Sequence, residues 1–431
     1  MSLPSPNGRR LTTPDYGSLI AKFGEMERQS RLILGFEVIA TFIALAVWIS
    51  RSGGVDWPIQ AWAACIGFFG MFWPFVYSLA ESKKAIQHLR TDISFGTHTR
   101  DSLVALVQRV CRRLQVDGKQ THVYLTREKE TNAYALRSEL LPGFRMLNSV
   151  RLNRGIVHLL DEHELETVVA HELGHVWFYS PLLTRCYLIH ALAASALSLA
   201  AVSFTAVDFG FAPFYPFMAL WAVNRIPVFP WIRMGRGIEF LCDDVGARGG
   251  GWLAAMSSEL KLGKENEARN QLMLEVLQAK QKGHNATLSH LMEVYERALP
   301  FGSSGDSGVQ KQLRHLLDSS HRENAGFSLR GFYAYIAGGS DNPEEGLNDT
   351  IKVLQMQAAL PAIPLDWSVV PTSSLQWSER LAENLIQSIE AMPDHVLIRT
   401  AHEVDDSGST HPNVSRRVLY LWRNRHRRPS R

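Results

Sequence analysis

Five consecutive residues in the middle of this 431-residue chain have the types and spacing of a metal-dependent hydrolytic site. His171 and His175 stand four residues apart in the sequence HELGH, so on a helix both imidazoles project from one face and reach one zinc ion. Glu172 lies beside them, placed to take a proton from a water held by the metal. We therefore predict one zinc ion per chain, with His171 and His175 as ligands and Glu172 as general base.

A catalytic zinc ion needs a third ligand from the protein and keeps a fourth position for water. The best candidate is Glu239 in the segment EFLCDD, which has Asp243 four residues on in a predicted helix. Glu239 is a candidate ligand, and Asp243 is a candidate acceptor that orients a ligand imidazole. The spacing alone fits a solvated acidic helix face equally well.

The HELGH residues need a helix to hold them, and residues 161–180 predict one. Asp161 is the expected N-cap, and Glu164, three residues on, is its expected capping-box partner. Pro181 ends the run. Upstream, residues 100–116 have helical periodicity, residues 122–126 read as a short strand, and residues 144–152 alternate like a second strand, which we expect at the edge of a small sheet.

Long apolar runs separate these polar segments. Residues 32–50, 59–80 and 186–207 each predict a membrane-spanning helix, because a 22-residue helix is about 33 Å long and a hydrocarbon core is about 30 Å thick. A fourth run, residues 209–232, is interrupted by an arginine and two prolines, so it either spans the membrane or lies in its interface. We expect a multi-pass membrane protein.

The cations that flank these runs set the orientation. The loops inside the two hairpins hold few cations. The cations before the first run and after the second are Arg9, Arg10, Lys22, Arg28, Arg31, Lys83, Lys84 and Arg90. The positive-inside rule then places both termini and the large polar segments in the cytosol, at the cytoplasmic membrane.

Composition excludes several other classes of protein. The chain has 45 Lys+Arg against 42 Asp+Glu and 46% hydrophobic residues, which is unlike a disordered chain or a strongly basic nucleic-acid binder. It has no phosphate-binding loop and no nucleic-acid module, so we expect no nucleic-acid partner. The four cysteines are widely spaced, which indicates neither a disulfide scaffold nor a thiolate zinc site.

Taken together, an HExxH motif between two hydrophobic hairpins and a following ExxxD element resemble the membrane zinc metallopeptidases of the HtpX and CAAX prenyl endopeptidase family. The sequence NAYA at residues 132–135 is similar to a family element, as is STHP at residues 409–412 with Arg417. The resemblance implies an α+β, mainly helical fold with a zincin-like metalloprotease domain, and it implies His171, His175 and Glu239 as zinc ligands.

The same resemblance assigns further roles. It implies that Asn132, Ala133 and Tyr134 line a groove where an extended peptide adds as a strand. It also implies that His411 and Arg417 approach the site and stabilise the oxyanion. Two positions depart from the family pattern: Asn413 replaces a second proline, and Cys242, where alanine is common, is expected to be a small buried filler.

These readings divide the chain into seven segments. They are a cytosolic N-terminal tail (1–31), a first transmembrane hairpin (32–80), a first catalytic part with HExxH (81–185), a second hydrophobic hairpin (186–232), a second catalytic part with Glu239 (233–300), an elaboration (301–400), and the THP…R motif with a basic tail (401–431). Within the second catalytic part and the elaboration we expect helices at residues 251–282 and 378–392.

We interpret the chain as a zinc endopeptidase that cleaves polypeptides at the cytosolic membrane face, in quality control of membrane proteins. A prenyl-protein processing protease of the CAAX type remains an alternative, since the motifs do not separate the two. An intramembrane protease is disfavoured, because the acidic residues that lead the HELGH helix are costly in hydrocarbon. A catalytically silent zinc scaffold is the other alternative, and the intact Glu172 argues against it.

Overall fold

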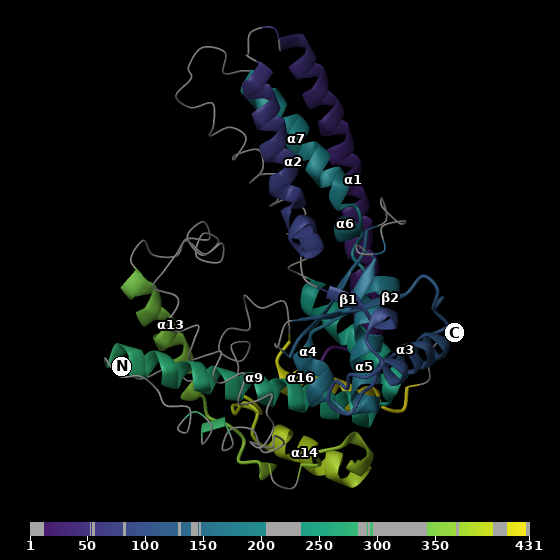
Figure 1. The fold of residues 1–431 in the computed structure, drawn as a ribbon, viewed down its shortest axis with the longest axis vertical. Helices are drawn as coiled ribbons and strands as arrows, with labels where there is room; N and C mark the ends of the chain where they lie inside the picture. Colours follow the sequence, from purple (N-terminus) through teal and green to yellow (C-terminus); the bar gives the residue numbers. More distant parts are fainter. Residues whose placement is uncertain are drawn as a thin grey trace.

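The computed structural model describes residues 13–51, 53, 57–80, 83–127, 131–138, 145, 148–203, 234–282, 291, 294–295, 343–367, 370–399 and 412–427. Within them the protein is mainly helical, with one small sheet. Figure 1 shows two parts: a bundle of long helices that extends away, and a larger body that holds the sheet. The predicted mainly helical α+β fold is confirmed at this level.

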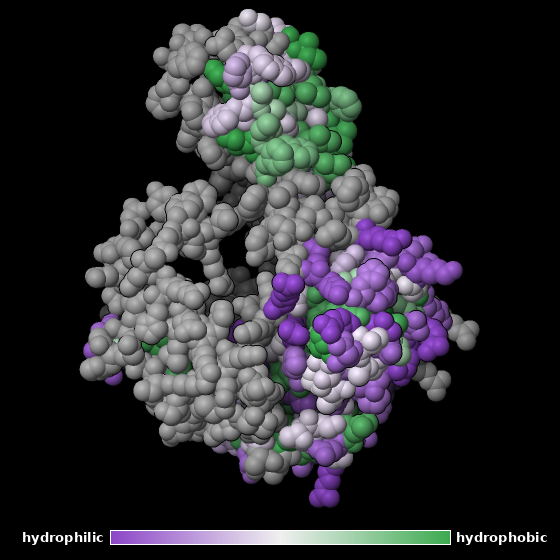
Figure 2. All heavy atoms as spheres, viewed as in Figure 1, coloured by the Kyte–Doolittle hydropathy of each residue, from purple (hydrophilic) through white to green (hydrophobic). Residues whose placement is uncertain are grey.

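The bundle consists of α1 (Tyr16–Arg51), α2 (Trp57–Ala80) and α7 (Tyr187–Ser203), and α7 packs against both other helices. They contain the described parts of the three apolar runs predicted to span a membrane. The apolar side chains that α1 leaves exposed include Leu32, Phe36, Ile39, Phe42, Ile43 and Ile49. Figure 2 shows hydrophobic residues over much of the bundle and mostly hydrophilic residues on the coloured, right-hand part of the body.

Among the described residues, α1 is the one helix found long and apolar enough to cross a membrane. The apolar helix α7 is shorter, at 17 residues. The fourth apolar run, residues 209–232, lies outside the described residues, so its path stays a prediction.

Polar contacts and a close backbone approach hold the bundle together. The Glu37 carboxylate lies 2.6 Å from Nδ1 of His190, and both side chains are buried between α1 and α7. Trp48 Nε1 donates to Gln60 Oε1 over 2.9 Å and joins α1 to α2. A Cβ at Gly67 of α2 would lie 2.7 Å from the Ala194 carbonyl oxygen, so only glycine permits this contact between α2 and α7.

The sheet has four strands: β1 (Lys83–Ala85), β2 (His122–Thr126), β3 (Ala133–Leu136) and β4 (Ser149–Leu152). Their order is β1-β2-β4-β3; β2 and β4 are parallel, and the other pairs are antiparallel. The predicted strand at residues 122–126 is confirmed.

The prediction of an edge strand within residues 144–152 was wrong. The strand there is β4, with only four residues, all buried, and it lies inside the sheet. The edge strand next to β4 is β3, which pairs with it in the register Tyr134 to Arg151, and β1 forms the opposite edge. Alternation in sequence identifies a strand but not its neighbours, which only long-range pairing decides.

The helices α3 (Arg100–Leu114) and α5 (Glu162–Leu173) share one core with the sheet and with the helix over residues 234–250. The N-terminal part of α1 joins the same core through Leu19 and Met26, so the longest bundle helix begins inside the body. Short elements complete this part: α4 (Arg154–Leu159), α6 (Leu182–Arg185) and the 3-10 helix η2 (Ile86–His88).

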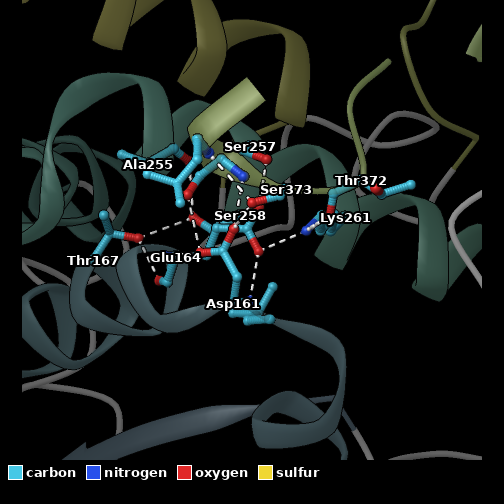
Figure 3. Close-up of polar contacts among 12 residues, drawn as sticks. Asp161, Glu164, Thr167, Ala255, Ser257, Ser258, Lys261, Thr372 and Ser373 are labelled. Atoms are coloured by element: carbon cyan, nitrogen blue, oxygen red, sulfur yellow. Dashed lines mark hydrogen bonds and ion pairs between the residues drawn. The ribbon is translucent and has the colours of Figure 1, made fainter. Parts of the chain in front are cut away.

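The start of α5 has the predicted capping box. Asp161 Oδ1 accepts from the Glu164 amide, and Glu164 Oε2 accepts from the Asp161 amide, each over 2.9 Å. The buried Glu164 also accepts from Lys261 Nζ over 2.7 Å, and Asp161 accepts from the Ser374 amide over 2.6 Å. Figure 3 shows how these carboxylates join α5 to α9 (Trp252–Gln281) and to the loop at Ser373.

A second core lies on the far side of α9. It packs α9 against α14 (Glu379–Ala391) and α16 (Val414–Asn424), and α13 (Pro343–Ala358) also contacts α9. The 3-10 helix η6 (Ser374–Gln376) precedes α14. The helices predicted at residues 251–282 and 378–392 are confirmed as α9 and α14, and this core positions Arg417 of α16.

Candidate metal centre and active site

The HELGH sequence lies across a change of helix type. The helix α5 ends at Leu173, and one π-helical turn, η4 (Gly174–Phe178), follows, closed by a 2.8 Å bond from the Tyr179 amide to the Gly174 carbonyl. Arg137, just beyond the edge strand, donates to the Val176 carbonyl of this turn. Such π turns inside helices often occur at functional sites.

The three candidate ligands come together at this junction. His171 Nε2 lies 3.2 Å from His175 Nε2 and 3.4 Å from Glu239 Oε2, and His175 Nε2 lies 3.5 Å from Glu239 Oε1. Ligand atoms of these three residues all lie within 4.8 Å of one another. Two ligand atoms about 2.05 Å from a tetrahedral zinc ion are about 3.3 Å apart, so these residues fit zinc.

Close helix packing brings Glu239 to the histidines. The helix over residues 234–250 packs on α5, and a Cβ at Gly249 would lie 2.2 Å from the Ala170 Cβ. At the metal end, a Cβ at Gly174 would lie 3.0 Å from Sγ of Cys242. Glycines at these points let the two helix backbones approach closely. Cys242 is fully buried, in agreement with its predicted role as a small filler.

Asp243 connects His171 to Arg417. His171 Nδ1 lies 3.0 Å from Asp243 Oδ1, and Arg417 Nε donates to Asp243 Oδ2 over 2.9 Å. A second Arg417 nitrogen also donates to Asp243. Burial raises the pKa of Asp243, but Arg417 and His171 outweigh it and hold this pKa below its usual value.

The carboxylates around His171 favour positive charge at its position. Burial lowers the pKa of His171, but its hydrogen bonds to Asp243 and Glu239 outweigh burial and raise this pKa to about 10. The site therefore stabilises a cation between these side chains. A divalent metal ion in place of the imidazolium proton matches that preference.

Glu172 is buried, at 7% exposed, and lines a cavity of about 410 Å³ together with His171 and Glu239. The cavity lies between α5, the edge of the sheet and α9. Asn132 and Ala133 line it at the start of β3, and Ser258, Glu259 and Leu262 line it from α9. It has room for side chains of a bound peptide next to the candidate metal ligands.

The other predicted site residues differ in whether they line the cavity. The ring of Tyr134 faces Arg151, whose guanidinium carbon lies 5.4 Å from the ring centroid, and Tyr134 is absent from the cavity lining. Arg417 lines the cavity while its guanidinium binds the Asp243 carboxylate, as described above. His411 lies outside the described residues.

Sequence reasoning missed Glu259. Its Oε2 lies 2.6 Å from Arg417 Nη1, and it is 8% exposed. Burial raises the pKa of Glu259 to about 7, although Arg417 opposes this rise. In the sequence, Glu259 follows two serines and precedes Leu260 in a predicted helix, a setting shared by many surface glutamates, so no local signal marks it.

Residues 97–260 match the sequence profile described as peptidase family M48. Two curated relatives, both named "Protease HtpX homolog", also match. The one from Campylobacter hominis is 27% identical over 166 residues, covering 37% of this chain and 53% of the relative. The one from Bacillus licheniformis is 23% identical over 142 residues, covering 32% of this chain and 46% of the relative.

This chain thus spans about half the length of the curated relatives it matches. No solved structure matches it significantly. The matched segment holds His171, Glu172, His175, Glu239 and Glu259, whereas Arg417 lies beyond it.

Proposed function

Because residues 97–260 match the profile of peptidase family M48, we propose that this chain is a zinc-dependent endopeptidase that hydrolyses peptide bonds of polypeptides. One observation carries the proposal. The nitrogens of His171 and His175 and the Glu239 carboxylate are spaced as zinc ligands, and Glu172 lines the same cavity as His171 and Glu239.

The roles of the residues follow from their positions. A bound zinc ion, held by His171, His175 and Glu239, supplies Lewis acidity that activates water and polarises the scissile carbonyl. The Glu172 carboxylate takes the proton of the attacking water and passes it to the leaving amine. Asp243 holds Nδ1 of His171, which directs Nε2 of the same ring toward the ligand cluster.

The edge strand β3 suits an extended substrate. It is an outer strand of the described sheet, and Asn132 and Ala133 line the cavity beside Glu172. A peptide added to β3 as a further strand gains main-chain hydrogen bonds that depend little on its sequence. We infer that such a peptide runs past Glu172. Arg137, which follows β3, donates to the Val176 carbonyl and so connects β3 to the π turn bearing His175.

We also propose that the bundle spans the cytoplasmic membrane more than once, with the catalytic body in the cytosol. The exposed apolar side chains along α1 and the cations that flank the apolar runs support this placement. On this basis the substrates are polypeptides near the membrane, including misfolded membrane proteins.

Zinc removal tests the proposed activity. Protein purified in detergent is expected to hold one zinc ion per chain and to cleave an unfolded casein-like polypeptide. A chelator is expected to abolish cleavage and added zinc to restore it, as followed by metal analysis and gel electrophoresis. Cleavage by zinc-free protein at the untreated rate would contradict the proposal.

The proposed orientation has its own test. Of the four cysteines only Cys65 is exposed, so Cys65→Ala gives a background for single introduced cysteines. A cysteine at Gly53 is expected to react with an impermeant maleimide added outside intact cells, because it follows α1 at the non-cytosolic end. A cysteine at Lys119 is expected to react only after permeabilisation. Labelling of Lys119→Cys in intact cells would reverse the orientation.

A further inference from the structure

Glu259 is a buried carboxylate to which the proposed hydrolysis gives no role. It lies on α9, lines the same cavity as Glu172, and contacts Arg417 of the neighbouring helix α16. A charged side chain that is 8% exposed is costly to bury unless its partners stabilise it. Its position therefore calls for an explanation in terms of those partners.

The contacts of Glu259 lead to the candidate metal centre in three steps. Glu259 Oε2 lies 2.6 Å from Arg417 Nη1, Arg417 Nε donates to Asp243 over 2.9 Å, and Asp243 Oδ1 lies 3.0 Å from His171 Nδ1. The four side chains come from four helices: α9, α16, the helix over residues 234–250, and α5. The second core, which includes α9 and α16, thus contacts the metal centre through these side chains.

The shape of the guanidinium makes Glu259 more than a counter-ion. Arg417 uses two nitrogens on Asp243 and a third on Glu259, so both carboxylates fix the plane of one rigid group. Without Glu259, Arg417 keeps its two hydrogen bonds to Asp243 but loses the contact that limits rotation of its side chain. Asp243 would then hold the His171 ring less firmly.

We propose that Glu259 is a positioning residue for the hydrolytic reaction, acting through Arg417 and Asp243 on the orientation of His171. The inference rests on the proposed function. It adds a residue that acts through Arg417, and it gives Arg417 the task of holding Asp243.

Zinc affinity measured by competition with a chelator tests this chain of contacts directly. Glu259→Gln is expected to lower zinc affinity about 10-fold, as loss of a hydrogen-bonding partner of a metal ligand typically does. It is also expected to lower kcat with little change in KM. Glu259→Asp, which keeps the charge, is expected to recover most of the affinity. Glu265→Gln is the matched control, because Glu265 is equally buried on α9 but bonds to Tyr295.

The order of the contacts is tested by a double-mutant cycle. If Glu259 acts through Arg417, the double variant Glu259→Gln with Arg417→Met binds zinc within about 2-fold of Arg417→Met alone. Additive losses would overturn the proposal, and so would a Glu259→Gln variant that binds zinc like wild type.

Thermal unfolding of the zinc-free proteins separates positioning from folding. A positioning role predicts that Glu259→Gln and Glu265→Gln unfold at similar temperatures and differ in zinc affinity. If Glu259→Gln does not fold, Glu259→Asp is used in its place. A Glu259→Asp variant with a zinc affinity as low as that of Arg417→Met would overturn the proposal. Wild-type protein that binds zinc but cleaves no polypeptide would refute the proposed function, while the zinc affinities would still report on Glu259.

Discussion

Glu172→Gln is expected to keep its zinc and to lose peptidase activity by about 10²- to 10⁴-fold, the range typical for a positioned general base. The amide has nearly the same shape as the carboxylate but cannot take the proton of the attacking water. Glu172 is not one of the three residues whose ligand atoms cluster, so the metal content should not change. Metal analysis and cleavage of an unfolded polypeptide, run on the same preparation, check both halves.

The control is the same change ten residues earlier on α5. Glu162 is half exposed and pairs with Arg109 away from the cavity, so Glu162→Gln should retain both zinc and activity. A Glu172→Gln variant that cleaves near the wild-type rate would show that another group accepts the proton. A Glu172→Gln variant without zinc would instead point to a defect in the site as a whole.

Local spacing was enough to predict the parts of this site that lie on one helix. His171 and His175 meet because they are four residues apart, and the capping box at Asp161 and Glu164 forms because both residues belong to one turn. Helices α3, α9 and α14 likewise follow from apolar periodicity with local caps and breaks.

The rest depends on packing between distant segments, which spacing does not encode. Glu239 reaches the histidines because Gly249 and Gly174 let two helices approach closely, a fact visible only once the helices are placed. The resemblance to a known family supplied Glu239 before the structure did. Neither spacing nor resemblance indicated that Arg417 binds Asp243 and Glu259.

The sheet illustrates the same limit. Strand β3 has only four residues and little alternation, so nothing local distinguished it from a loop. Because β3 pairs with β4, the strand expected at the edge lies inside the sheet. The NAYA element, which includes part of β3, lies at that edge instead. The candidate substrate strand was thus named by resemblance, while its edge position came from pairing.

The second large effect is expected at Glu239, whose carboxylate lies within 3.5 Å of both ligand imidazoles. Glu239→Ala removes one of three ligands from the protein and is expected to lose zinc under mild chelation. Asp243→Ala removes only a group that orients His171, and such losses typically cost about 10- to 100-fold in metal affinity. Chelator competition measures the difference between the two variants.

Asp244→Ala is the matched control, because Asp244 follows Asp243 on the same helix but pairs with Arg248 and lies away from the cavity lining. Its zinc affinity should be near that of wild type. The geometry therefore predicts the largest loss of zinc affinity for Glu239, a metal ligand, a smaller loss for Asp243, which contacts a ligand, and almost none for Asp244, which pairs with Arg248. If Glu239→Ala stays fully loaded while Asp243→Ala is empty, the third ligand is the aspartate, and the Arg417 contact then holds a ligand directly.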